Sequence, residues 1–372
     1  MTTETQDLTA MLRESARDFT AREQDLRAYR ARMGQPPGHD AARFGKMQEL
    51  GWRGALVREE LGGAGMGLRE AAAIAGELGR GLVGDVYLAT SVLPALLLED
   101  HAALAAAAPL LQAIADGSAV AALAWQERPD ALDPAAIETH ATRQGGEYAL
   151  RGAKRWIAAG QAASSFLVSA RLDDGIAVFL VPRTATGAVV ETQWQVDGTA
   201  AAALRLEDVR VGADALVVAP TEGAAALGRA LDATAVAASA ELLGVASAAF
   251  DMTISYMKTR VQFDKPIGSF QALQHKAVDL LVQRELAASV LEEAVEAFSA
   301  ADGNDAARSR IAGRCKARCS DAALRITREC IQLHGAIGYT HEYDLGLYVK
   351  RALVLAAWLG NGAQHRARQR NA

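Results

Sequence analysis

The sequence has little that would indicate a secreted, metal-binding or membrane protein. It contains three cysteines in 372 residues, Cys315, Cys319 and Cys330, and no CxxC pair. A disulfide framework or a zinc site is therefore not expected, and few, reduced thiols are typical of cytoplasmic proteins. The first residues show neither a basic segment nor an apolar core, so no secretory signal is predicted. Polar residues and glycine interrupt the Ala-rich stretch 102–124, which is too mixed for a membrane span. We expect a cytoplasmic protein with no metal and no membrane partner.

An excess of basic charge is also absent. Lysine and arginine number 39 against 44 aspartates and glutamates, for a net charge of -5. A nucleic-acid-binding surface is therefore not expected. The apolar fraction of 51% and the charged fraction of 22% are those of an ordinary globular protein, and the length predicts more than one domain.

The periodicity of apolar residues divides the chain into three regions. Residues 9–118 and those after Pro220 have helical spacing, whereas the region between them has short strand-like runs. These runs are 147–150, 165–170, 176–181, 189–192 and 204–211. We predict a mainly α protein with a central β-domain, divided into residues 1–119, 120–219 and 220–372. A glycine-rich stretch at 62–67 follows no clear strand, and we interpret it as a loop and not as a nucleotide-binding motif.

One C-terminal segment has the pattern of a helix in an antiparallel bundle. Its apolar residues alternate at four- and three-residue steps, with Arg284 in the single polar position. The apolar positions are Leu273, Ala277, Leu280, Ala287, Leu291, Ala294 and Phe298. A second long helix is predicted over 306–333.

Two further stretches carry the most specific signal. Residues 256–279 read YMKTRVQFDKPIGSFQALQHKAVD, and residues 332–344 read QLHGAIGYTHEYD. In this order the pair resembles the acyl-CoA dehydrogenase family of flavoproteins. The resemblance spans nearly the whole chain. It implies an N-terminal helical domain, a β-barrel or β-sandwich domain, a C-terminal four-helix bundle and an FAD cofactor.

The first stretch has the side chains that a flavin dinucleotide requires. Arg260 offers a permanent charge and paired donors suited to phosphate, Phe263 and Phe270 offer apolar faces, and Gln271 can donate and accept. By the resemblance, these four residues bind the adenine–pyrophosphate half of FAD. The alternative is that Arg260 pairs with a carboxylate and the phenylalanines belong to the bundle core.

The second stretch is implied to reach the same dinucleotide from a neighbouring subunit, through Gln332, Leu333, Gly335 and Ala336. Gly335 permits close approach of the backbone. Ala336 and Asp264 stand where family members usually have glycine. Both departures are expected to weaken binding of the dinucleotide unless a nearby cation compensates for Asp264.

The central region contains further positions that match the family. Trp156 and Ile157, in LRGAKRWI, correspond to the strand that packs a tryptophan against the isoalloxazine ring. Gln126 lies in a segment that resembles the loop between the flavin ring and the acyl-CoA. Asn361, after Gly360, is also assigned to the cofactor site by the resemblance. The alternative for Trp156 is a buried core residue.

The catalytic base of the family is missing from its usual position. Removal of a thioester α-proton needs a positioned carboxylate of raised pKa. Leu359 stands where most members have glutamate, and Thr234 where a minority have it. The nearest candidate is Glu241, two helical turns after Thr234 in an apolar run. Three interpretations of Glu241 are open: a relocated base, a member of a buried ion pair, or a residue that contacts the surroundings of the flavin. Glu342 belongs to a Glu-Tyr pair that the family has independently of the base.

This combination resembles the small subunits of pimeloyl-CoA dehydrogenase and of related steroid-side-chain dehydrogenases, which work as α2β2 assemblies. The implied activity is FAD-dependent oxidation of an acyl-CoA to the 2-enoyl thioester, with an electron-transfer flavoprotein as acceptor. The partner is implied to be a related chain, in a homo- or hetero-tetramer. The alternatives are a homotetrameric enzyme that uses Glu241, a non-catalytic FAD-binding or scaffold subunit, and a flavin monooxygenase of the same fold.

Overall fold

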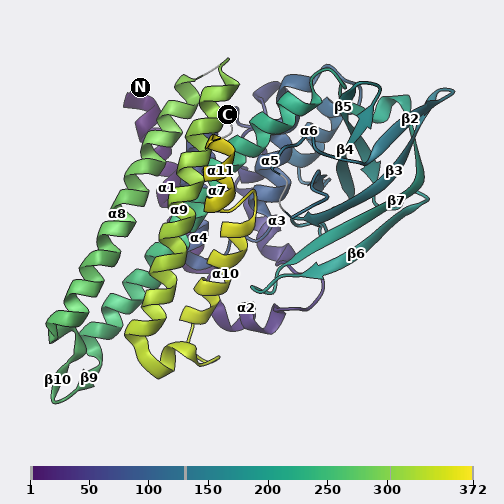
Figure 1. Ribbon diagram of the computed structural model, residues 1–372. Helices are drawn as coiled ribbons and strands as arrows, with labels where there is room; N and C mark the ends of the chain where they lie inside the picture. The colour runs from purple at the N-terminus through teal and green to yellow at the C-terminus, as the bar shows by residue number, and fades with distance from the viewer. Residues whose placement is uncertain (1–2, 130–131, 302, 371–372) are drawn as a thin grey trace.

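The computed structural model describes residues 3–129, 132–301 and 303–370. In the sequence, helices precede and follow the strands, and in space the sheet lies to one side of the helices (Figure 1). This confirms the predicted fold class, mainly α with a central β-domain. The boundaries at residues 119 and 219 stay predictions.

The N-terminal region is a set of helices joined by short turns. Asp25 and Asp40 begin the second and third helices by accepting backbone N–H groups with their side chains, as N-cap residues do. The glycine-rich stretch 62–67 is a loop, as predicted. The elements are α1 (Thr3–Glu23), α2 (Leu26–Arg32), α3 (Ala41–Glu49), η1 (Trp52–Gly54), η2 (Glu59–Leu61), α4 (Leu68–Gly81), the π-helical turn η3 (Leu88–Val92), α5 (Leu93–Leu98), η4 (Glu99–His101) and α6 (Ala107–Ala115).

The central region forms one sheet with the order β6-β7-β3-β2-β4-β5-β8, in which β1 pairs in parallel with β4. Its members are β1 (Ala121–Ala124), β2 (His140–Gln144), β3 (Glu147–Ile157), β4 (Ser165–Leu172), β5 (Gly175–Pro182), β6 (Ala188–Trp194), β7 (Ala200–Gly212) and, after the turn η5 (Ala213–Ala215), β8 (Leu216–Val218). All five predicted strands are present, each longer than its most apolar run. The strands have their own hydrophobic core, centred on residues such as Phe166, Phe179 and Leu204.

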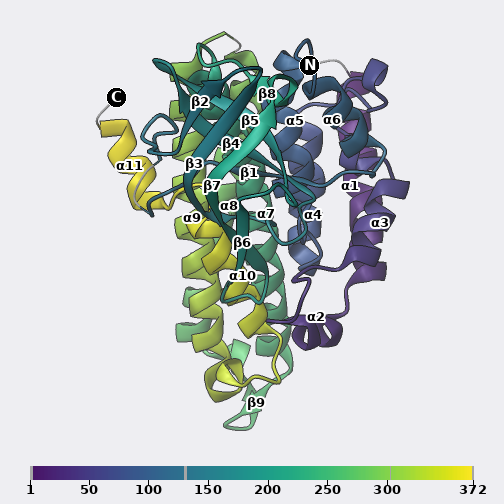
Figure 2. The ribbon, with the colours of Figure 1, turned by 90° about the vertical axis from the view of Figure 1, so that its right-hand side faces the viewer.

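The C-terminal region is a bundle of long helices. Its elements are α7 (Gly223–Thr259), β9 (Val261–Gln262), β10 (Lys265–Pro266), η6 (Ile267–Ser269), α8 (Gln271–Ala300), α9 (Asp305–His334), η7 (Gly335–Tyr339), α10 (Leu345–Ala357) and α11 (Gly362–Arg370). By length and composition α7 could cross a membrane, a feature that the sequence patterns above did not single out. However, 83% of its most apolar window is buried inside the fold, as in the core helix of a soluble protein. Figure 2 shows the sheet near one end of the bundle and the β9 turn at the other.

The predicted seam on α8 is present. Ala277, Leu280, Ala287, Ala294 and Phe298 are buried. The other two apolar positions of the seam are partly buried and pack against the same core. The neighbour of this seam is α9, which continues the bundle as predicted over 306–333.

The central helix α7 lies very close to α4. Gly244 of α7 faces the backbone of α4 so closely that a Cβ atom would overlap the carbonyl oxygen of Gly76. Gly228, on the same helix, has open space where a Cβ atom would be. The distance between the two helices, and so the position of Glu241 between them, depends on the missing side chain at Gly244.

We predict opposite effects for two glycine replacements on α7. Gly244→Ala should lower the free energy of unfolding by about 1–3 kcal/mol, because the helices must separate to admit the methyl group. Gly228→Ala should raise it by about 0.5–1 kcal/mol, because alanine restricts the unfolded chain and favours the helix. Urea denaturation of both variants measures the difference, and equal effects would contradict the close contact.

Candidate functional site

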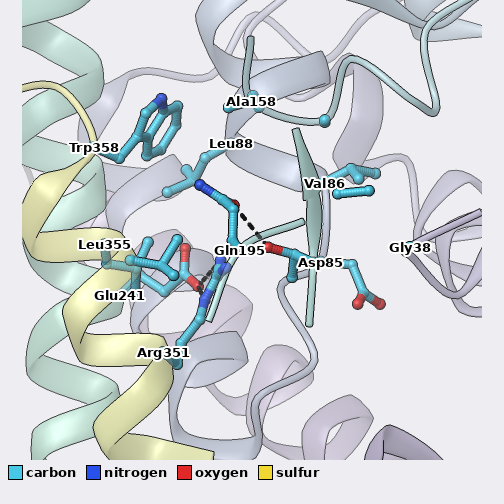
Figure 3. A pocket seen from close by; sticks show the side chains of 15 residues that line it. Gly38, Asp85, Val86, Leu88, Ala158, Gln195, Glu241, Arg351, Leu355 and Trp358 are labelled. Atoms are coloured by element: carbon cyan, nitrogen blue, oxygen red, sulfur yellow. Dashed lines mark hydrogen bonds and ion pairs between the residues drawn. The ribbon is translucent and has the colours of Figure 1, made fainter. Parts of the chain in front are cut away.

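A pocket lies where the N-terminal helices, the sheet, α7 and α10 meet (Figure 3). It is small, with a cavity volume of about 40 Å³. Ala158 and Ala159, directly after the Trp156–Ile157 segment, form part of its wall, so the pocket adjoins the positions predicted to face the flavin ring. The other lining residues are Gly38, Asp85, Val86, Leu88, Ala89, Gln195, Thr199, Ala200, Glu241, Arg351, Val354, Leu355 and Trp358.

The two ends of the pocket differ in polarity. Trp358 and Ala158 lie at one end, with Leu88 between them and the interior (Figure 3). Glu241 and Arg351 lie at the other end, below Leu355 (Figure 3). A ligand that enters beside Trp358 would meet apolar walls first and a charged group last.

Glu241 forms a buried ion pair. Its side chain comes from α7 and its residue is 3% exposed. Arg351 of α10 donates to Oε1 of Glu241 through Nε at 2.9 Å and Nη2 at 2.6 Å. Burial raises the pKa of Glu241, and the guanidinium of Arg351 opposes this rise. The ion-pair interpretation of the sequence is thus present in the structure, while the role of Glu241 as a base stays a prediction.

Arg351 also holds a second carboxylate. Its Nη1 donates to Oδ2 of Asp197, in the turn between β6 and β7, at 3.1 Å. Asp197 Oδ1 accepts the backbone N–H and the hydroxyl of Thr199. The Tyr29 hydroxyl donates to the Asp197 carbonyl at 3.1 Å. The guanidinium of Arg351 therefore connects α7, α10 and the β6–β7 turn. Tyr29 connects α2 to the same turn.

The remaining carboxylate of the pocket is Asp85. It accepts a hydrogen bond from Nη1 of Arg43 at 2.8 Å, and both side chains are buried. Burial raises the pKa of Asp85, and Arg43 counteracts this. In Figure 3 the Asp85 carboxylate points away from Glu241, toward Gly38. Asp85 is therefore held outside the interior of the pocket.

Neither family position for the base carries an acidic group. Leu359 is 6% exposed and has a left-handed φ of 59°. Thr234 is fully buried, and its hydroxyl donates to the Ala230 carbonyl at 2.7 Å. Thr234 is also not among the residues that line the pocket.

The turn that carries Leu359 is fixed by two buried side chains. Nζ of Lys316 donates to the carbonyls of Leu355, Ala356 and Gly360 at 2.9, 3.2 and 3.0 Å. His365 Nε2 donates to the Leu359 carbonyl at 2.9 Å. Burial lowers the pKa of Lys316 to about 7. An ammonium at the end of α10 satisfies its last carbonyls and holds Trp358 against the pocket.

The predicted adenine–pyrophosphate residues lie at the far end of the bundle, around the β9–β10 turn (Figures 1 and 2). Arg260 is exposed and forms no ion pair with a described residue. Phe263 is 85% exposed, and its ring meets that of Phe270 edge-on at 6.1 Å. Gln271 is the exposed first residue of α8. The alternatives of a carboxylate partner for Arg260 and a core position for Phe263 are therefore wrong, whereas Phe270 is half-buried and packs against the bundle core.

The second predicted arm lies at the same end. Gln332, Gly335 and Ala336 are exposed at the end of α9, while Leu333 is buried. The nearby His334 ring stacks on Tyr256 of α7 at 4.4 Å, which links this arm to the β9–β10 end. Both arms lie far from the pocket of the same chain, so a single chain does not bring all the predicted flavin residues together.

The remaining predicted flavin residues lie on the pocket side. Trp156 is 37% exposed with a φ of 52°, so it is not a buried core residue, while Ile157 is buried. Gln126 is half-buried and donates to the Arg128 carbonyl at 3.1 Å. Asn361 is exposed and caps α11, where its Oδ1 accepts the Gln364 backbone N–H. Exposed aromatic surface and an exposed guanidinium fit the apolar walls and the phosphate donor that FAD requires.

Sequence patterns did not predict Arg351, Asp197, Asp85 or Trp358 as site residues. One signal could have found Arg351, because it directly precedes the apolar run ALVLAAW of α10, and Glu241 stands in an apolar run of α7. A buried charge needs a partner, so an acidic residue in one buried helix and a basic residue in another are expected to form an ion pair. The described residues contain no cluster of histidine, cysteine, aspartate and glutamate that could hold a metal ion.

We predict that Arg351→Met destabilises the protein in a pH-dependent way. Breaking a buried pair costs about 3–5 kcal/mol, and here both Glu241 and Asp197 lose their guanidinium partner. Without Arg351, the pKa of Glu241 in the folded variant lies above its unfolded value. The folded variant is therefore most stable below about pH 4.3, where Glu241 is protonated, and its free energy of unfolding falls as the pH rises. Urea denaturation at acidic and at neutral pH tests this. The double variant Arg351→Met/Glu241→Gln should lose most of this dependence, and a loss that is equal at every pH would contradict the prediction.

Comparison with known proteins gives a consistent result over the whole chain. Models of the acyl-CoA dehydrogenase N-terminal, middle and C-terminal domains match residues 6–118, 122–209 and 221–369. The probable acyl-CoA dehydrogenase YngJ of Bacillus subtilis is 30% identical over 93% of this chain and 92% of its own length. The acyl-CoA dehydrogenase IpdE2 of Mycobacterium tuberculosis is 32% identical over 92% and 90%. A solved structure of the Tcur3481-Tcur3483 steroid ACAD superposes with a TM-score of 0.87 and 29% identity, covering 98% of this chain and 97% of that one. This chain therefore belongs to the acyl-CoA dehydrogenase family of FAD-dependent oxidoreductases.

Proposed function

We propose that this chain is one subunit of a two-component acyl-CoA dehydrogenase of fatty acid or steroid catabolism. The observation that carries the proposal is Leu359, a buried hydrocarbon side chain at the usual position of the base, on a turn that adjoins the pocket. A related chain would supply the carboxylate. The similar Tcur3481-Tcur3483 steroid ACAD carries the names of two proteins, which supports a paired assembly.

The reaction defines what the pair of chains must provide. Dehydrogenation removes a proton from the α-carbon and a hydride from the β-carbon of the acyl group, and leaves a trans-2-enoyl thioester. FAD, when bound, supplies the hydride acceptor. A carboxylate within hydrogen-bond reach must take the α-proton in a site without water. This chain contributes the apolar walls that exclude water, including Leu88, Leu355 and Trp358.

We infer that FAD lies between two chains. Trp156, Ile157, Gln126 and Asn361 of one chain would contact the flavin side. The other chain would contribute the β9–β10 end, with Arg260 on the pyrophosphate and the 332–336 arm beside it. The separation of these groups within one chain supports this arrangement, as does their exposure.

A second candidate is a homotetramer in which Glu241 is the base. Two observations favour it: Arg351 binds Oε1 and leaves Oε2 toward the pocket, and burial raises the pKa of Glu241. The arginine opposes it, because a paired carboxylate accepts a proton less readily. For either candidate we propose a cytoplasmic enzyme that passes its electrons to an electron-transfer flavoprotein.

We predict that the purified chain alone keeps its flavin absorbance when acyl-CoAs are added without oxygen, and that co-expression with a related chain restores bleaching. The physical reason is that Leu359 cannot accept a proton. Bleaching by the lone chain that disappears in Glu241→Gln, but not in Glu60→Gln at an exposed position, would instead support the homotetramer. A chain that binds no flavin with any partner would refute both candidates.

We also predict that Arg260→Ala yields protein with less than one flavin per site, because the pyrophosphate loses its charged donor. The ratio of visible to ultraviolet absorbance measures the flavin content. Arg22→Ala, which removes an exposed arginine from α1, is the matched control and should retain full flavin. Full flavin content in both variants would contradict the role of Arg260.

A further inference from the structure

One oxygen of the buried Glu241 carboxylate has no donor among the described residues. Arg351 directs both Nε and Nη2 to Oε1. In Figure 3 the other oxygen points into the pocket, toward the side of Leu355 and Trp358. The residue is 3% exposed, yet this oxygen is not among the fully buried atoms that lack a partner, so it faces space that a ligand donor can enter. The pocket therefore has an acceptor at its charged end that a ligand can satisfy.

The charges around this end do not balance. Glu241, Asp197 and Asp85 are three carboxylates, whereas Arg351 and Arg43 are two guanidinium groups. The further pair of Arg32 with Asp40 is neutral. One negative charge is thus in excess, and the carboxylate that faces the interior of the pocket is Glu241. A ligand group placed beside it meets a negative potential in a region that little water reaches.

Much of the rest of the pocket wall near Glu241 is aliphatic. Val86, Leu88, Ala89, Val354 and Leu355 line it, and none of these side chains carries a polar atom. Gln195 and Thr199 also line the pocket; the Thr199 hydroxyl donates to Gln195 Oε1, and no described residue accepts from the Gln195 amide N–H groups. The aliphatic part of this wall suits the end of an acyl chain, which would arrive at Oε2 of Glu241.

We propose that Glu241 selects the acyl group, so that the pocket prefers an aliphatic chain with a hydroxyl group at its far end and rejects one that ends in a carboxylate. A hydroxyl donates to Oε2 and brings no charge. A terminal carboxylate would place a second negative charge next to Glu241 and leave both without a donor. An unsubstituted alkyl end lies between these cases, because it adds neither the hydrogen bond nor the repulsion. This inference rests on the proposed function, since it assumes that the pocket receives the acyl part of a CoA thioester.

Binding, and not turnover, tests the selection. The chain, with the flavin and partner that co-purify, is titrated by calorimetry with CoA thioesters of a series of chain lengths. At each length the chain ends in a methyl, a hydroxymethyl or a carboxyl group. At the best length we expect the hydroxyl form to bind about tenfold or more tightly than the carboxyl form, since each tenfold needs only the energy of one good hydrogen bond.

The variant Glu241→Gln removes the excess charge and leaves Arg351 paired with Asp197. It should strengthen binding of the carboxyl form by about tenfold and bring the hydroxyl and carboxyl forms within a fewfold of each other. Glu77→Gln is the matched control, because Glu77 is a buried, arginine-paired carboxylate on α4 that does not line the pocket. It should keep the order of the wild type.

The outcomes separate this inference from the proposed function. Thioester binding whose order is the same in the wild type and in Glu241→Gln overturns the selection by Glu241 and leaves the proposed function standing. Preference of the wild type for the carboxyl form also overturns it. If Glu241 acted only as a base, Glu241→Gln would keep all affinities and lose flavin bleaching. Failure of every thioester to bind overturns both the inference and the proposed function.

Discussion

The structure depends on the buried guanidinium of Arg351. This one group from α10 binds Glu241 of α7 and Asp197 of the β6–β7 turn, and Tyr29 of α2 binds the carbonyl of Asp197. A buried charge is tolerated only when its partners are all in place. The helical bundle, the sheet and the N-terminal helices must therefore dock together, and the pocket forms at the point where they meet. Selection of a ligand and assembly of the domains thus use the same few side chains.

The walls of the pocket follow from this arrangement and from one further buried cation. Lys316 holds the last carbonyls of α10 and the Gly360 carbonyl, so the turn with Trp358 and Leu359 has a fixed position. The turn is thus held firmly in this chain, although leucine stands at the position where the family usually has its acidic side chain. This combination agrees with the proposal that a partner chain supplies the carboxylate.

The surface supports the same view of an assembly. Large apolar side chains are exposed along one face of α8 and at the β9–β10 end, among them Val278, Val282, Leu286, Phe263 and Tyr339. Exposed apolar patches of this kind mark interfaces in soluble proteins. The face of α8 opposite its buried seam and the end that carries Arg260 are thus the surfaces that a second chain and a shared dinucleotide would cover.

The sequence by itself determined the elements and the family. The apolar residues of α8 recur at regular steps from Leu273 to Phe298, and strand-like runs occur between 147 and 211. Both patterns depend only on spacing along the chain, so they can be recognised without knowledge of the tertiary contacts. The motif around Arg260 and the leucine at 359 are likewise visible without coordinates. Only the tertiary structure decided the state of Glu241. Its partner Arg351 is 110 residues away and Asp197 lies in a third region, so their contact exists only once three domains are packed. Sequence patterns report on neighbours along the chain, whereas the charge balance of a buried site is set by residues that the fold brings together.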